Sequence, residues 1–368
     1  AGAGASGGAG KPDHAPGLPD KSRITPFPKV EAGSPRVMEF GVHDHHTVKS
    51  GRNHWDLRIG DPRTGIAHSW AIPKARLPEP GEKLLALAQP DHTIAYMSFH
   101  GSLPEGYGYG RVSLPHRGRA EVVEADADKV RVNWYSGREI TELLLFRAKG
   151  NAWLVTNTTP TRKDLPDTKP AYKEVSPDKV SMDDDGEILQ AKADGAPVLA
   201  VFSPGRQTRV MSYRPTERKA GIIDHTWRMP SLAGHKGSEE TGDTVLRGEA
   251  YSTKGGTPLQ AQRVGGMLNA DVWKSRLLQE VEGPLSTALF DVVRYKGRPA
   301  ADMPYAEKLR IIREIVARED SEGRLFHLPD TAETPQDKRR LFDAIKAGRH
   351  PQTSEGVVVW RKDSPHPA

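Results

Sequence analysis

Two groups of residues in this sequence have side chains and spacing suited to phosphate chemistry. The first is Lys192-Ala193-Asp194-Gly195, in which a deprotonated lysine amine could attack the α-phosphate of a nucleotide. The second is His54-Trp55-Asp56-Leu57-Arg58, in which a histidine, a carboxylate and a guanidinium alternate. Successive side chains of a strand point to opposite faces, so His54, Asp56 and Arg58 would share one face. The sequence therefore predicts one site for a covalent lysine and another for a metal and a phosphate.

Further histidines lie upstream of the alternating group. His43-Asp44-His45-His46 precedes the polar stretch 47–53, which is typical of a hairpin loop. Two His and one Asp from neighbouring strands would suit Mn or Zn, with open positions left for water or substrate. Arg58 adds a planar fork that matches the geometry of a phosphate. On these residues alone, an exposed sheet face without a metal is the alternative.

Composition limits the class of protein and the kind of metal site. The 368 residues include no cysteine, which excludes disulfides and thiolate ligands, so a metal must be held by His and carboxylate. The formal net charge of +5 favours a polyanionic partner. No apolar run approaches the roughly 20 residues of a membrane span, so no membrane partner is expected. We expect either a cytoplasmic, nucleoid-associated protein or a phage-associated one.

Changes in composition divide the chain into four regions. Residues 1–35 are rich in Gly, Ala, Ser and then Pro, which predicts a disordered arm. Residues 36–160 contain short strand-like runs broken by Gly, Pro and Asp, which predict a mainly β domain, a small barrel or a sandwich. Residues 161–186 are expected to be a proline-rich linker. Residues 187–368 mix strand-like runs with amphipathic helices, which predicts an α+β domain.

The elements of the last region follow from hydrophobic periodicity. Strands are predicted at 198–202, 209–213, 244–251, 288–293 and 356–360. One helix is predicted over 305–318, because Leu309, Ile312, Ile315 and Val316 would share a face. A second is predicted over 335–347, and Gly348 suits its C-terminal cap.

Several motifs follow one another in the mainly β region. They are Phe40 followed by His45, then His54-Trp55-Asp56-Leu57-Arg58-Ile59, Ser69-Trp70-Ala71-Ile72-Pro73-Lys74, Asp91-His92-Thr93-Ile94-Ala95-Tyr96 and Gly101-Ser102-Leu103-Pro104-Glu105-Gly106. In this order they resemble the 3′-phosphoesterase domain of bacterial DNA ligase D. The resemblance implies removal of a 3′-phosphate or 3′-ribonucleotide from DNA or RNA/DNA ends, with Mn or another divalent metal.

The resemblance also implies roles for individual residues. His45, His54 and Asp56 would be the metal ligands, and Arg58, His92 and Tyr96 the catalytic phosphate-binding and acid groups. His92 would protonate the leaving oxygen, because imidazole titrates near neutrality. The loop before His54 is longer than in the family, so His46 or His43 could replace His45 as a ligand. Two further positions depart from the family pattern. Lys83-Leu84 stands where the family has Lys-Arg, and Pro90 stands where the family has an acidic residue.

Several further motifs follow the lysine motif along the chain. Ser212-Tyr213-Arg214, Leu246-Arg247-Gly248-Glu249, the run 288–297 around Phe290, and Ser354-Glu355-Gly356 follow it in order. Together they resemble the adenylation domain of ATP-dependent DNA ligases, an α+β nucleotidyltransferase fold of the ATP-grasp-like ligase type. The resemblance implies Lys192 as the catalytic nucleophile that accepts AMP from ATP. The implied cofactor-binding residues are Lys192, Asp194, Gly195, Arg214, Glu249, Phe290 and Glu355.

This half departs from the family at three charged positions. Pro197 replaces an arginine, Arg247 replaces the aspartate of Asp-Gly-Glu, and Trp360 replaces a lysine. The final Lys-x-Lys strand and the oligonucleotide-binding (OB) domain of ligases are not in this sequence. We therefore expect one of three situations. The chain is trimmed, or its partners are a separate OB-type domain or other repair or virion proteins, or this domain is degenerate.

The function predicted from the sequence is DNA repair by end processing. One domain would clean a 3′ end to a hydroxyl, and the other would handle an adenylated 5′ phosphate. The alternative is a catalytically degenerate nucleic-acid-binding or structural protein, such as a virion or complex subunit, that keeps both folds.

Overall fold

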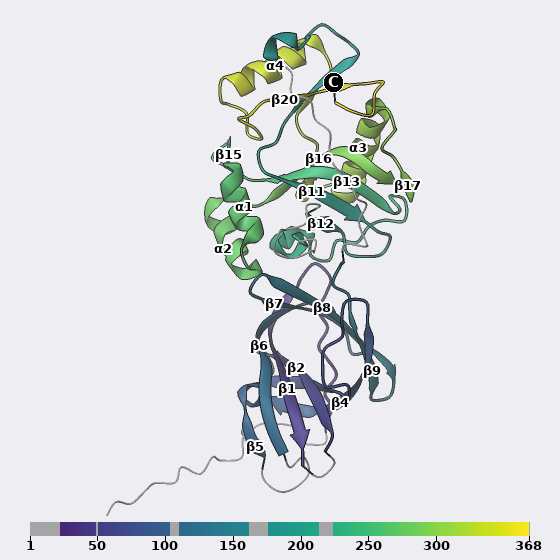
Figure 1. Ribbon diagram of the computed structural model, residues 1–368, viewed down its shortest axis with the longest axis vertical. Helices are drawn as coiled ribbons and strands as arrows, with labels where there is room; N and C mark the ends of the chain where they lie inside the picture. Colours follow the sequence, from purple (N-terminus) through teal and green to yellow (C-terminus); the bar gives the residue numbers. More distant parts are fainter. Residues whose placement is uncertain (1–22, 49–50, 104–109, 162–175, 213–223, 368) are drawn as a thin grey trace, which may run out of the picture. The chain divides into compact units, whose positions relative to one another are not determined.

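The chain forms two compact units, Ala1–Thr159 and Pro160–Ala368. The computed structural model describes residues 23–48, 51–103, 110–161, 176–212 and 224–367 (Figure 1). No helix within these ranges is long and apolar enough to cross a membrane.

The N-terminal unit is a closed antiparallel barrel. Its strands are β1 (Arg36–Thr47), β2 (Asn53–Asp61), β3 (Ile66–Ile72), β4 (Lys83–Thr93), β5 (Gly101–Leu103), β6 (Gly110–Ala125), β7 (Lys129–Ser136), β8 (Glu139–Lys149) and β9 (Ala152–Asn157). They are hydrogen-bonded in the order β1-β2-β3-β4-β9-β8-β7-β6, and β6 pairs back with β1. Strand β5 extends the sheet beyond β6.

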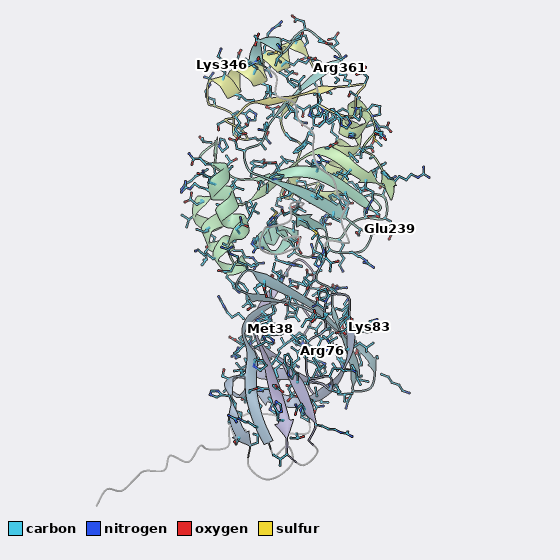
Figure 2. All side chains as sticks on the ribbon, viewed as in Figure 1. Met38, Arg76, Lys83, Glu239, Lys346 and Arg361 are labelled. Atoms are coloured by element: carbon cyan, nitrogen blue, oxygen red, sulfur yellow. The ribbon has the colours of Figure 1, made fainter. Side chains whose placement is uncertain are left out.

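Strand alternation determines which residues lie inside this barrel. Phe40 and Val42 of β1 and Leu57 and Ile59 of β2 belong to the barrel core. Met38, labelled in Figure 2, belongs to the same core and is 1% exposed. The intervening residues of β1 and β2 must therefore lie on the outer wall, which is where the polar groups of the predicted metal site fall.

A short segment covers this outer wall. The 3₁₀ helix η1 (Ala95–Ser98) follows β4, and its Tyr96 and Met97 are buried. A side chain at Gly60 would bring its Cβ to 2.8 Å from both Ile94 Cγ1 and Met97 Sδ. Gly60 therefore lets η1 lie directly on β2.

The segment from residue 23 to β1 is ordered against the barrel, which corrects part of the expected arm. Thr25 donates its backbone N–H to the Asp91 carboxylate, and Val30 exchanges two backbone hydrogen bonds with Ala125. Phe27 and Val30 are buried in the core. The Pro- and Lys-rich composition concealed these two apolar anchors. Residues 1–22 lie outside the described ranges.

The C-terminal unit contains two main sheets. Strands β12 (Arg209–Met211), β11 (Ala196–Phe202), β13 (Thr244–Tyr251), β16 (Ser286–Tyr295) and β17 (Arg298–Pro299) are adjacent in that order, and β18 (Phe326–His327) pairs with β16. The second sheet has the order β19 (Thr331–Ala332), β10 (Glu187–Ala191), β20 (Val357–Arg361). A small ribbon joins β14 (Thr253–Lys254) and β15 (Thr257–Pro258).

Four α-helices accompany these sheets in the described residues: α1 (Ala261–Asn269), α2 (Val272–Glu282), α3 (Tyr305–Glu319) and α4 (Pro335–Lys346). Figure 1 shows α1 and α2 side by side along one flank of the larger sheet. The apolar face of α3 contributes Ile311, Ile312 and Ile315 to the core of this sheet. Short 3₁₀ turns lie at Pro177–Lys179, Thr226–Arg228 and Pro230–Leu232.

The fold class predicted from the sequence is confirmed: a mainly β barrel comes first and an α+β unit follows. Helices α3 and α4 were predicted, whereas α1 and α2 were not. Gly265-Gly266 in α1 lowers its helix propensity, which hides it from pattern analysis. Residues 176–186, expected in a linker, pack on the second unit instead: Val180 and Met182 contact its core.

Candidate phosphoesterase and nucleotidyltransferase sites

Strands β1 and β2 bring three potential metal ligands together on the outer wall of the barrel. His45 is paired with His54 across the two strands, and His43 is paired with Asp56. Asp56 Oδ2 lies 3.4 Å from His54 Nε2 and 4.0 Å from His45 Nδ1. One ligand atom from each residue lies within 4.8 Å of the others, and no other such group of three occurs in the described residues. Direct pairing of these consecutive strands thus brings His45 of β1 against His54 and Asp56 of β2.

The two alternative ligands have other surroundings. His46 contacts Asp44 instead, with 3.2 Å between His46 Nε2 and Asp44 Oδ2, and about half of its side chain is exposed. His43 is buried behind the ligand group, where its Nδ1 accepts a hydrogen bond from Arg58 Nε at 3.1 Å. The structure therefore favours His45 over both as the partner of His54 and Asp56.

Arg58 is held by three neighbours at once. Besides His43, its Nη1 donates to Ser69 Oγ at 2.6 Å and its Nη2 donates to Asp56 Oδ2 at 3.4 Å. Within the described residues these bonds occupy three of the five guanidinium N–H groups and leave two for a phosphate oxygen. The side chain is only 5% exposed, so little of it is accessible to a phosphate.

Aromatic rings cover Arg58 and connect it to His92. The Tyr96 ring lies 5.1 Å from Arg58 Cζ. His92 stacks on Tyr96 with 4.6 Å between ring centroids, and Phe99 stacks on Tyr96 at 5.6 Å. His92 on β4 is paired with Ala67 of β3, which places it on the outer wall. Of the two predicted acid and phosphate-binding residues, Tyr96 thus lies against Arg58 and His92 lies against Tyr96.

Burial and charge set the protonation of the group. Burial and the Arg58 guanidinium lower the pKa of His43 to about 4, so this imidazole is neutral and can accept from Arg58. A hydrogen bond to Asp56 raises the pKa of His54. Burial alone would raise the pKa of Asp56, but the hydrogen bond from His54 and the charge of Arg58 outweigh it and lower the pKa. Asp56 is therefore a carboxylate.

The donor set fits a divalent transition metal. Bonds of about 2.1 Å from one ion to imidazole nitrogen and carboxylate oxygen separate the ligand atoms by roughly 3–4 Å. The separations of 3.4 and 4.0 Å around Asp56 match this requirement. Two imidazoles and one carboxylate suit Zn or Mn and leave further coordination positions open.

The second site lies where β10 ends and β20 begins. Lys192 follows β10, and its backbone N–H donates to Gly356 O at 3.0 Å. Its Nζ donates to Glu355 Oε2 at 2.9 Å, and the lysine side chain is 56% exposed. The hydrogen bond to Glu355 raises the pKa of Lys192, with a smaller contribution from Glu249. The lysine is consequently a charged ammonium in this arrangement.

Asp194 and Gly195 hold the backbone of this site together. Asp194 is buried; its Oδ2 accepts from the backbone N–H and hydroxyl of Ser354, and its Oδ1 accepts from Thr353 Oγ1. A Cβ on Gly195 would lie 1.8 Å from the carbonyl oxygen of Ala250. Both residues were predicted to bind nucleotide, and the structure shows both joining neighbouring segments.

The remaining predicted cofactor residues have mixed surroundings. Glu249 lies on β13, half-buried and close enough to influence Lys192. Phe290 packs, partly exposed, beside Tyr305, whose hydroxyl donates to the Phe290 carbonyl at 2.9 Å. Arg214 lies outside the described residues.

The departures from the ligase pattern alter the chemistry of this site. Trp360, at the expected lysine position, is 1% exposed and stacks on Tyr305 with 3.9 Å between ring centroids. Its indole N–H donates to Gln190 at 3.2 Å. Arg247 is buried with its Nε 3.9 Å from Asp291 Oδ2. A cation is lost at one position, and an acid is replaced by a base at another.

The sequence did not identify three residues of these sites as functional. Ser69 supports Arg58, and Thr353 and Ser354 bind Asp194. Ser69 is opposite Arg58 in the β2–β3 register, so a correct strand alignment would have identified it. Thr353 and Ser354 lie far along the chain, in or next to the Ser354-Glu355-Gly356 motif, and nothing in the sequence shows that this segment binds Asp194.

Comparisons with known proteins agree with these resemblances. A family model described as "DNA Ligase D 3'-phosphoesterase domain" matches residues 43–156. The multifunctional non-homologous end joining protein LigD of Mycolicibacterium smegmatis is 25% identical over 364 residues, covering 92% of this chain and 41% of that protein. The LigD protein of Mycobacterium tuberculosis is 31% identical over 134 residues, covering 35% of this chain and 17% of that protein.

A solved structure of the ligase domain of M. tuberculosis LigD matches at 16% identity and a TM-score of 0.34, over 50% of each chain. A TM-score at this level does not establish a shared fold. The resemblance to ligase D is thus confirmed by sequence, most strongly in the barrel. The chain spans less than half of the length of the curated relatives it matches.

Proposed function

We propose that the barrel is a divalent-metal-dependent 3′-phosphoesterase that restores a 3′-hydroxyl on DNA or RNA/DNA ends. The observation that carries the proposal is the group of His45, His54 and Asp56, with ligand atoms within 4.8 Å, directly beside a buried Arg58. The match of residues 43–156 to the ligase D 3′-phosphoesterase family supports it.

The chain's own residues would share the work as follows. His45, His54 and Asp56 would hold the metal, which polarises a phosphoryl oxygen and lowers the pKa of bound water. Arg58 would bind a phosphate oxygen through its two remaining N–H groups. His92 would donate a proton to the leaving 3′ oxygen as the P–O3′ bond breaks and the water oxygen bonds to phosphorus. His43 and Ser69 would keep Arg58 in place.

The test is removal of a labelled 3′-phosphate from a duplex end in the presence of Mn²⁺. The parent should release phosphate and leave a 3′-hydroxyl, lose activity with a chelator, and regain it when Mn²⁺ is added back. Matched ends with a 3′-ribonucleotide show which terminus is preferred. Absence of release from any such end by folded protein would refute the proposal.

For the second unit we propose a ligase-like nucleotide site with Lys192 as the residue that would accept AMP. The pairing of Lys192 with Glu355, and Glu249 beside it, support this proposal. Because the hydrogen bond to Glu355 favours the ammonium, a nucleotide must draw Glu355 away before the amine can attack. Incubation with labelled ATP should label the parent and leave Lys192→Met unlabelled.

A second candidate for this unit is nucleotide or nucleic-acid binding without ligation. The specific observation in its favour is Trp360, which occupies a position expected for a lysine. Its ring stacks on Tyr305 and its indole N–H donates to Gln190. ATP binding without lysine labelling would support this candidate over adenylation.

A further inference from the structure

The 3₁₀ helix η1 lies over two glycines of the outer wall, and the second of them separates two arginines. Gly41 of β1 is paired with Arg58 of β2 on one side and with Arg117 of β6 on the other. A Cβ on Gly41 would lie 3.4 Å from Arg117 Cδ and 3.5 Å from Met97 Cε. Met97 and the stem of Arg117 therefore occupy the space above Gly41, as Met97 also does above Gly60.

The η1 segment extends from one of these arginines to the other. The ring of Tyr96 lies 5.1 Å from Arg58 Cζ and stacks on His92. Two residues later, the exposed Ser98 accepts a hydrogen bond at its Oγ from Arg117 Nε, at 3.2 Å. A shift of η1 would thus move Tyr96 relative to both Arg58 and His92.

Arg117 is fixed on the sheet by contacts that do not involve η1. Its Nη1 donates to Glu39 Oε2 at 2.6 Å. The same nitrogen donates to the carbonyl oxygens of Phe40 and Gly118 at 3.4 and 3.2 Å. These acceptors belong to β1 and β6, so the sheet sets the position of the guanidinium. The bond from Nε to Ser98 then connects this fixed group to η1.

The shape of the guanidinium distinguishes this contact from an ordinary surface ion pair. A pair between Arg117 and Glu39 alone would contribute little, because both side chains are partly exposed. The planar fork, however, directs Nη1 toward the sheet and Nε toward Ser98 at the same time. A lysine has a single nitrogen on a flexible stem, so it can keep the charge beside Glu39 without holding Ser98 as well.

We propose that Arg117 is a positioning residue of the barrel site, which holds Ser98 and thereby keeps Tyr96 against Arg58 and His92. Arg117 acts through η1 and needs no contact with the metal or the substrate. That the positioned residues serve catalysis rests on the proposed phosphoesterase function. Breaking the bond between Arg117 and Ser98 should therefore lower kcat and leave KM nearly unchanged.

The effect on η1 can be tested without catalysis, by NMR of the metal-free protein. The imidazole C–H resonances of His92 are assigned with His92→Gln. The Tyr96 ring is nearly parallel to His92, with 16° between the planes, so its ring current should shield these protons. Ser98→Ala and Arg117→Lys should each move the His92 resonances downfield. Unchanged resonances in both folded variants would overturn the proposal.

The matched control is Arg76→Lys (Figure 2). Arg76 also bonds a glutamate of the barrel, but its hydrogen bonds within the described residues go to Glu82 and Leu77. The His92 resonances should stay in place in this variant. An equal shift in Arg76→Lys would show that any loss of an arginine disturbs the site, which would also overturn the proposal.

A kinetic experiment connects η1 to the reaction. On a 3′-phosphate end at saturating Mn²⁺, Ser98→Ala and Arg117→Lys should each lower kcat about fivefold, as the loss of one hydrogen bond allows. The double variant should be no slower than either single variant, because both changes break the same bond. A rise in KM in Arg117→Lys, with parental kinetics in Ser98→Ala, would instead assign Arg117 to substrate binding and overturn the positioning role.

The outcomes separate this proposal from the phosphoesterase proposal. Parental kcat in both variants of an active parent refutes the positioning role and leaves the phosphoesterase proposal intact. No release of phosphate by the folded parent refutes the phosphoesterase proposal, and the His92 resonances then decide alone whether Arg117 holds η1 in place.

Discussion

The two candidate sites differ in how their key residues are held. In the barrel, His45, His54 and Asp56 lie on paired strands, and Arg58 behind them is 5% exposed and bonded to three side chains. In the second unit, Lys192 is 56% exposed and is paired with its own Glu355. As proposed, the first site would receive a metal and a phosphate with little rearrangement, whereas the second would exchange its internal ion pair for a ligand before reacting.

A site built on paired strands needs less rearrangement on ligand binding than a site that depends on a loop. Strand pairing sets the histidine and carboxylate positions before anything binds. The lysine site depends on the loop at Thr353–Glu355, held by Asp194. We therefore expect mutations in the barrel site to affect chemistry more than folding, and mutations around Asp194 and Gly195 to do the reverse.

The largest effect should come from removal of a metal ligand. His54→Ala should lower 3′-phosphate release by more than about 100-fold, since even the outer partners of metal ligands are worth 10–100-fold. The matched control is His46→Ala, which removes a histidine of β1 that contacts Asp44 instead. Initial rates at saturating Mn²⁺ measure both. A large loss in His46→Ala with normal activity in His54→Ala would reverse the ligand assignment.

Replacement of the arginine by lysine should have the next largest effect. Arg58→Lys keeps one positive charge but cannot bond His43, Ser69 and Asp56 together, so kcat should fall about 10- to 100-fold. Measuring kcat and KM separately on the 3′-phosphate end checks this. Unchanged kinetics would show that the fork of Arg58 has no part in the reaction.

Much of the barrel site could be predicted from sequence, because its residues alternate within one short strand. His54, Asp56 and Arg58 share a face for that reason alone. The choice among His43, His45 and His46 depended on the β1–β2 register, which the intervening loop conceals. For Asp194 the sequence predicted the motif but not the partners. Thr353 and Ser354, which bind its carboxylate, lie far away in sequence.

A pair of glycine substitutions compares the packing of the two units. Gly195→Ala places a Cβ 1.8 Å from the backbone oxygen of Ala250, which cannot move without breaking a strand pair, so we expect a loss of at least about 3 kcal/mol in unfolding free energy. Gly60→Ala meets the side chains of Ile94 and Met97 at 2.8 Å, which can rotate, so about 1–2 kcal/mol is expected. Urea denaturation measures both. A larger loss for Gly60→Ala would contradict this order.

The smallest effect concerns the Lys192–Glu355 pair. Because Glu355 raises the pKa of Lys192, the pair contributes stability below the ordinary lysine pKa of 10.5 and loses it as pH rises above that value. Glu355→Gln should therefore lower the lysine pKa and raise the rate of amine acylation at pH 9 severalfold, with little change in stability because the pair is half exposed. Mass spectrometry of the Lys192 peptide follows the reaction. An unchanged rate would show that Glu355 does not control the amine.

The central claim is that the barrel carries a preorganised metal site made by His45, His54 and Asp56. Titration with Mn²⁺ followed by electron paramagnetic resonance tests it most directly, since free Mn²⁺ is counted without any substrate. We predict one bound ion per parent chain, retained in His46→Ala and lost in Asp56→Ala. Failure of the folded parent to bind Mn²⁺ or Zn²⁺, or binding that persists in Asp56→Ala, would contradict the account.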